Sequence, residues 1–86
     1  MVLKTDGKDS IKFTYYPNPV TDRLHIISGS TITLVEVYTL QGQKVISQQW
    51  NVSTGDLNMV QLEEANYLVR VYSENNTQSF MVAKGH

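Results

Sequence analysis

The chain has 86 residues, a net charge of −1 and 17% charged residues, so it shows no electrostatic footprint for nucleic acid or for an anionic lipid surface. It contains no cysteine, which excludes a disulfide framework and a thiolate metal site, and its length indicates a single domain. No apolar run approaches the roughly 18 residues that span a bilayer, so we expect no direct membrane insertion. The opening, MVLKTDGKDS, has no apolar export region and fits a piece of a longer protein better than a complete gene product.

Apolar residues recur at every second position in short bursts, which is the period of β-strands, and no segment has convincing helical spacing. The first predicted strand spans residues 11–15 and ends at two prolines. The second contains Leu24 and Ile26 and closes at residues 28–30, Ser-Gly-Ser, where glycine frees the backbone to turn.

The third predicted strand, residues 31–40, has apolar residues of both parities, which indicates a β-bulge or a strand covered on both faces. Gln41-Gly42 separates it from a fourth strand over residues 43–50. A two-residue loop with glycine second is typical of a hairpin, so these two strands should pair antiparallel.

Residues 51–56 have the composition of a loop, and a fifth short strand follows over residues 57–62. The sixth strand, residues 67–71, shows the clearest alternation. Residues 75–76, Asn-Asn, form a predicted tight turn before a last strand over residues 79–84. Seven short antiparallel strands joined by turns predict an all-β fold, an Ig-like β-sandwich.

The inward positions of these strands give the predicted core. It consists of Phe13, Leu24, Ile26, Val35, Val37, Val45, Leu62, Tyr67, Val69, Val71, Phe80 and Val82.

Both prolines of the chain, Pro17 and Pro19, flank Asn18. Each proline fixes its own φ, pushes the preceding residue toward extended geometry and cannot donate a ladder hydrogen bond. We expect this stiff segment to end the first strand and to carry the backbone across to the opposite sheet. Thr21 and Asp22 can then bond nearby backbone amides and start the second strand.

These residues also carry a resemblance to a known family. The motif Y-P-N-P-V-T-D-x-L-x-I at residues 16–26, followed by V-x-V-Y-x-L-x-G-x-x-V at residues 35–45, resembles the C-terminal sorting domain (type A, Por secretion system family) of type IX secretion cargo in Gram-negative Bacteroidetes. The pattern L-x-x-G-x-Y-x-V-x-V is matched at residues 62–71 except at the glycine. The resemblance covers residues 13–84, and its first block is the most specific part.

The resemblance implies a non-enzymatic secretion signal that directs an N-terminally fused cargo through the type IX system across the outer membrane. Members are recognised by outer-membrane components of the secretion machinery and cut off by a sortase-like surface peptidase, and their cargo is often attached to an anionic lipopolysaccharide. We therefore expect a location in the periplasm in transit, and then at the cell surface or outside the cell. Residues 1–10 would be a flexible N-terminal linker, with the cut before or within it, and residues 11–86 the sorting domain.

The resemblance also indicates the residues that are recognised: Pro17, Asn18, Pro19, Asp22, Gly42, Phe80, Met81, Val82 and Lys84. An edge strand offers unpaired amides and carbonyls, so we expect the terminal strand to be read by β-augmentation against a secretion component, and the same edges allow a dimer. Gly85 and His86 extend beyond the usual pattern. Ala65 stands where the family has glycine, and a positive φ there would strain alanine by roughly 1 to 2 kcal/mol unless Asn66 takes the turn.

Other chemistries find little support in the sequence. His25 lies on the outward face of its strand without partner ligands, and the carboxylates Glu63, Glu64 and Asp22 read as solvated loop charges. Residues 6–9 lack the later ligands of a calcium loop. No nucleophile elbow or phosphate-binding loop is present, so we expect no enzyme activity and no cofactor.

Two rival interpretations remain open. Trp50 and the five tyrosines could form the face of a carbohydrate-binding or adhesive sandwich attached to a secreted enzyme, although aromatic residues are common in strands in any case. The second rival interpretation is a purely structural spacer.

Overall fold

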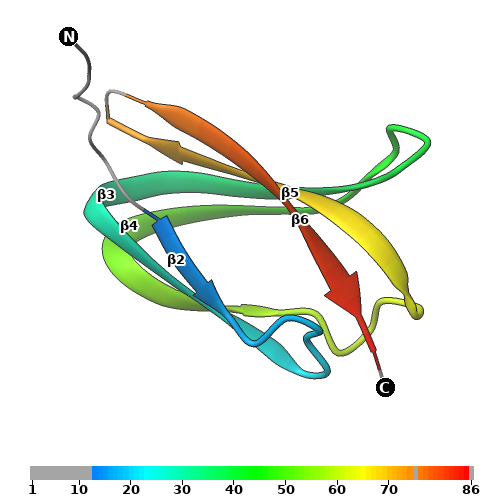
Figure 1. Cartoon of the computed structure of the whole chain (residues 1–86). Helices are drawn as coiled ribbons and strands as arrows, with labels where there is room; N and C mark the ends of the chain where they lie inside the picture. The colour runs from blue at the N-terminus through cyan, green and yellow to red at the C-terminus, as the bar shows by residue number, and fades with distance from the viewer. Residues whose placement is uncertain (1–12, 75, 86) are drawn as a thin grey trace, which may run out of the picture.

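The protein is all-β in residues 13–74 and 76–85, the part of the chain that this computed structural model describes (Figure 1). The strands are β2 (Phe13–Tyr16), β3 (Arg23–Thr39), β4 (Lys44–Asn58), β5 (Ala65–Ser73) and β6 (Thr77–Lys84). They form one antiparallel sheet in the order β2-β3-β5-β6, and β4 pairs with β3 outside this path. The all-β prediction is confirmed, but the described residues form five strands instead of seven. The predicted linker, residues 1–10, lies outside them.

Strand β3 is long enough to serve two groups of partners. Residues 25–28 pair with β2 and residues 32–39 pair with β5, while β4 follows β3 along its other edge. Between these stretches the β3–β4 register slips, because residues 28–31 of β3 stand against residue 53 alone in β4. Extra residues on one strand bend it. The β3–β4 pair therefore curls over and brings β2 to face β6, as Figure 1 shows.

Two predicted strand boundaries are wrong. Residues 28–30 and residues 51–56, a predicted turn and a predicted loop, lie inside β3 and β4. These small and polar residues bend the ladder without ending it. Gly55 also makes room for an aromatic ring, since a Cβ at this position would lie 2.8 Å from Cζ3 of Trp50. Each of the two predicted pairs of short strands is thus one long, bent strand, which accounts for the count of five.

The predicted hairpin at Gly42 is confirmed, with a loop one residue longer than expected. The Thr39 amide donates to the Gln43 carbonyl at 2.8 Å, and the Gly42 amide donates to the Thr39 carbonyl at 3.0 Å. Residues 40–42 therefore form a three-residue loop. Gly42 has a φ of 95°, the left-handed conformation that such a loop requires at its last position.

A β-bulge at Val45 explains one error in the predicted core. Val37 stands opposite Ile46 and Tyr38 opposite Lys44, so Val45 is an extra residue on β4. A slip of one residue moves a side chain to the other face of a sheet. Val45 is 37% exposed, and Ile46 packs against the core in its place.

Strands β5 and β6 form the second predicted hairpin. The Ser73 amide donates to the Asn76 carbonyl at 2.8 Å, and the strands continue as an antiparallel pair. Asn75, half of the predicted turn, lies outside the described residues. The alternation predicted for β5 is confirmed, because Tyr67, Val69 and Val71 are all buried.

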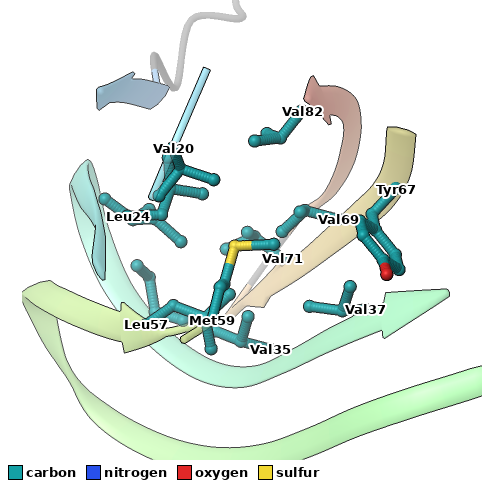
Figure 2. Packing of buried hydrophobic residues seen from close by; sticks show 12 residues of the cluster. Val20, Leu24, Val35, Val37, Leu57, Met59, Tyr67, Val69, Val71 and Val82 are labelled. Atoms are coloured by element: carbon teal, nitrogen blue, oxygen red, sulfur yellow. The ribbon is translucent and has the colours of Figure 1, made fainter. Parts of the chain in front are cut away.

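The core fills the inside of the curl (Figure 2). Its buried residues are Val20, Leu24, Ile26, Ile32, Val35, Val37, Leu57, Met59, Tyr67, Val69, Val71 and Val82. Phe13, Leu62 and Phe80, also predicted to face inward, are partly buried against this cluster. The prediction missed Val20, Ile32, Leu57 and Met59, which lie beside the prolines, at the register slip and at the end of β4.

Candidate recognition surface

The proline segment joins the two ends of the curled sheet. It follows β2 through cis peptide bonds at Tyr16-Pro17 and Asn18-Pro19 and then reaches β6. Val20 forms a parallel bridge with Lys84. The predicted crossing to an opposite sheet is wrong, because the next strand, β3, pairs antiparallel with β2 in the same sheet. The proline segment contacts β6 at Val20 on its way to β3.

Three hydrogen bonds join the proline segment to the end of β6. The Ala83 amide donates to Oδ1 of Asn18 at 3.0 Å, and the Val20 amide donates to the Ala83 carbonyl at 2.8 Å. The Gly85 amide completes the set by donating to the Val20 carbonyl at 2.7 Å. We call this contact between residues 18–20 and residues 83–85 the terminal latch. The asparagine between the prolines has a clear role in the latch, because its side-chain oxygen accepts the hydrogen bond of the Ala83 amide.

The terminal latch determines which part of the β6 edge stays open. In an antiparallel ladder the amide and carbonyl of one residue point to the same side, and the side alternates along the strand. Both main-chain groups of Ala83 point away from β5, into the latch, so those of Met81 and Ser79 point away from β5 as well. Among the described residues, no strand pairs with this edge at Ser79 or Met81. The expected free edge is therefore short and lies ahead of the latch.

Most of the predicted site residues in β6 face inward. Val82 is 1% exposed and Lys84 is 6% exposed, with its Nζ donating to the Gly85 carbonyl at 2.9 Å. Phe80 stacks on Tyr15 of β2, with ring centroids 3.9 Å apart and planes 8° apart. Met81 alone of the four predicted residues presents its side chain to solvent, with 47% exposed.

The predicted residues in the loops lie apart from each other. Asp22 is exposed, and its main-chain carbonyl accepts from the Met59 amide at 2.8 Å, which ties the start of β3 to the end of β4. Gly42 lies at the tip of the β3–β4 hairpin. Ala65 and Asn66 are both strand residues of β5, paired with Lys84 and Ala83, so neither occupies the turn that the family glycine indicated.

A carboxylate network lies on the face of β3, β5 and β6 that is turned away from the core, which we call the outer face. Glu36, only 7% exposed, accepts hydrogen bonds at Oε1 from Tyr38 at 2.8 Å and Tyr72 at 2.9 Å. Lys44 Nζ lies 3.3 Å from Oε2. The bond from Tyr38, helped by Tyr72 and Lys44, holds the pKa of Glu36 below its ordinary value despite the opposing effect of burial. The same bond raises the pKa of the Tyr38 hydroxyl.

Sequence reasoning missed this network, although the sequence carries a signal for it. Glu36 and Tyr38 share one face of β3, and the register places them opposite Arg70 and Leu68 of β5. Polar residues at alternate positions, 36 and 38 in β3 and 70 and 72 in β5, indicate a sheet face on which charged and hydroxyl groups pair across the strands.

Beside the network the outer face is hollowed. The hollow has a volume of about 340 Å³ and is lined by Tyr38, Thr39, Leu40, Gly42, Leu68, Arg70 and Met81. Leu40 is 58% exposed. Two predicted site residues from distant parts of the chain, Gly42 and Met81, therefore meet at one surface feature.

His25 remains a partly exposed surface histidine, as predicted. Its Nδ1 contacts the Asp56 carboxylate across the β3–β4 pair, and its ring tilts against Tyr16 with centroids 5.1 Å apart. In residues 13–74 and 76–85 no three histidine, cysteine or acidic side chains gather to hold a metal. The same residues contain no helix of the length and hydropathy needed to cross a membrane.

Comparison with protein families gives one clear result. A family model described as secretion system C-terminal sorting domain matches residues 14–83. No curated protein and no solved structure matches the chain significantly.

Proposed function

The chain belongs to the family of secretion system C-terminal sorting domains, and on this premise we propose that it directs a cargo, fused to its N-terminal side, through the type IX secretion system. The family implies a sorting signal of this system, with export to the cell surface or beyond. The proposal places the domain in a Gram-negative Bacteroidetes cell, first in the periplasm and then at the outer membrane.

One structural observation carries the proposal. The Y-P-N-P block and the terminal strand, 65 residues apart at Asn18 and Ala83, form a single unit through the terminal latch. The most specific block of the resemblance and the terminal strand therefore support one another physically. A signal read at its C-terminal strand needs that strand fixed in one conformation, because ordering a free tail on binding would cost conformational entropy.

We propose that outer-membrane components of the machinery read β6 by β-augmentation. The open main-chain groups of Ser79 and Met81 support this mechanism, since an extended partner segment can add to an unpaired edge. Val82 and Lys84 would hold that edge from inside the fold, where they are buried, and Asn18 would hold it through the terminal latch. Pro17 and Pro19, which are exposed, would keep the latch segment stiff. Asp22, Gly42 and Phe80 would hold the strands and loops around that edge in place. The open edge also supports dimerisation as a competing use of the same groups.

The remaining steps of the proposal follow the family. A sortase-like surface peptidase would cut on the N-terminal side of the domain, within or before residues 1–10, and release the cargo from residues 11–86. The domain itself would carry no enzyme activity.

We also infer that the curled sheet is a form of the Ig-like sandwich in which β3 and β4 belong to both layers. The stack of Tyr15 on Phe80 supports this, because it joins β2 to β6 across the curl.

The carbohydrate-binding alternative gains no support from the aromatic residues. Tyr15 is stacked on Phe80, Tyr38 and Tyr72 bond Glu36, and the Trp50 ring packs over Gly55. Tyr16 is half exposed and tilts against His25, so the exposed aromatic surface of the described residues is a single ring and not a flat row for stacking on sugar. A glycan array with the isolated domain should therefore show no binding.

Secretion of a fusion protein tests the proposal. A periplasmic reporter fused to this domain should reach the cell surface in a type IX-competent Bacteroidetes host, and a fusion lacking residues 79–86 should stay in the periplasm. Replacing the domain by an unrelated β-sandwich controls for a mere spacer. If the truncated fusion or the unrelated sandwich were exported as well as the full domain, the sorting role would be rejected.

A further inference from the structure

The hollow on the outer face has an apolar interior and one charged wall. Leu40, Leu68 and Met81 come from three different strands or loops and surround it, and Leu40 and Met81 are about half exposed. Arg70 is the only charged side chain among the described residues that line it. Exposed aliphatic groups gathered around a hollow are typical of a site that receives an apolar side chain.

Arg70 is held in place by its neighbours. Its Nε donates to Oγ of Ser79 at 3.3 Å, and its guanidinium carbon lies 5.6 Å from the centre of the Tyr38 ring. The neighbouring Tyr72 hydroxyl raises the pKa of Arg70 above its ordinary value. A guanidinium fixed in this way loses little conformational entropy when it pairs with a carboxylate.

The charges beside the hollow leave Arg70 only partly neutralised. Glu36 stands opposite Arg70 in the β3–β5 register, but its carboxylate is already shared by two tyrosine hydroxyls and by Lys44. Within this group of three charges, the two cations Lys44 and Arg70 share one carboxylate. The complement of this surface is an apolar group followed by a negative charge.

We propose that this hollow binds an acidic peptide segment, with a leucine-sized side chain between Leu40, Leu68 and Met81 and an adjacent carboxylate on Arg70. The inference concerns side chains of the outer face that adjoin the open main-chain edge of β6 at Met81, and it does not depend on the secretion role. Apolar contact supplies the affinity and the arginine supplies the selection for an acid.

Titration of the ¹⁵N-labelled domain with capped dipeptides tests the proposal. N-acetyl-Leu-Glu-amide should shift the amide signals of Leu68, Arg70 and Met81 and leave those of His25 and Asp56 unchanged. N-acetyl-Leu-Gln-amide should bind about fivefold more weakly, as expected for the loss of one exposed ion pair. Equal binding of both peptides, shifts spread away from the hollow, or no shifts at all would overturn it.

Two variants of Arg70 test whether this residue causes the preference for an acidic peptide. Arg70→Gln should remove the preference for Leu-Glu over Leu-Gln, and Arg70→Lys should keep part of it, since the charge remains without the planar fork. Arg23→Gln is the matched control, because Arg23 is exposed at the start of β3 and lines a different hollow. A preference that survives in Arg70→Gln, or disappears in Arg23→Gln, would contradict the assignment.

Sedimentation of the unliganded domain, at the concentration used in the titration, tests whether a second copy of the domain occupies the hollow. A monomer agrees with the proposal. Self-association that shifts Leu68 and Met81 without peptide would show that a second copy occupies the hollow, and the proposal would be rejected.

Discussion

The two halves of β6 present opposite surfaces to a partner. In the C-terminal half, Val82 and Lys84 are buried and both main-chain groups of Ala83 are used in the terminal latch. In the preceding half, Ser79 and Met81 are exposed, and within the described residues no strand pairs with their outward edge. One strand thus combines two tasks: its end closes the fold, and the part before it offers an edge. Changes in the two halves should therefore have different consequences.

The largest contrast is expected between two adjacent residues of β6. Val82→Ala should lower the free energy of unfolding by about 2 kcal/mol, because it removes buried methyl groups and leaves a cavity. Met81→Ala should change it by less than about 0.5 kcal/mol, since the Met81 side chain is half exposed. Urea unfolding of both variants measures the difference. Equal losses would show that the two halves are not distinct.

A smaller effect should follow from opening the terminal latch. Asn18→Ala leaves the Ala83 amide without its acceptor and should lower stability by about 1 kcal/mol. Amide exchange of Ala83 and Gly85 should become faster, while that of Val69 in β5 keeps its protection. Hydrogen exchange followed by NMR measures both effects.

Asn58→Ala provides the matched control for the latch. Oδ1 of Asn58 also accepts a main-chain hydrogen bond, from the Val60 amide at 3.0 Å, but this contact is local to the end of β4. The control should leave exchange at Ala83 unchanged. Faster exchange at Ala83 in the control, or none in Asn18→Ala, would remove the special role of the proline segment.

The smallest effect on stability is expected from Glu36, on the outer face beside the open half of β6, and it depends on pH. The folded pKa of Glu36 is lowered from 4.5, so the folded state releases this proton more readily than the unfolded chain. The stabilisation is present above pH 4.5 and is lost as the pH falls through the folded pKa.

Comparison with Glu36→Gln isolates this contribution. The stability advantage of the natural chain over the variant should shrink between about pH 6 and about pH 3, as linkage requires. Urea unfolding across this range gives the difference. An advantage that stays constant or grows on acidification would contradict the lowered pKa.

The alternating strands could be predicted from sequence because alternation alone determines which side chains are buried. Val69, Val71 and Val82 follow this rule. It failed where one strand gains a residue over its partner. Val45 was predicted to face the core but is an extra residue on β4, and residues 28–31 bend β3 where a turn was expected. Such slips depend on tertiary pairing, which local composition does not contain.

The sequence could nominate candidate residues for the site but not their arrangement. Asn18 and Lys84 carry the resemblance in the sequence, yet their roles depend on a contact across most of the chain. The open edge at Met81 emerges only once the latch shows which main-chain groups of β6 are taken. Glu36 and Arg70 occupy variable positions of the quoted patterns, and the register of β3 and β5 places them opposite each other.

Export of a cargo fused to a Met81→Pro variant tests the central claim most directly. Proline at this position removes one outward amide of β6 and leaves its pairing with β5, because edge strands tolerate proline where the amide faces solvent. Met81→Val changes the side chain and keeps the amide. With both domains folded to the same unfolding midpoint, we expect the proline fusion to remain in the periplasm and the valine fusion to reach the surface. A folded proline variant that reaches the surface as efficiently as the natural domain would contradict reading through the open edge.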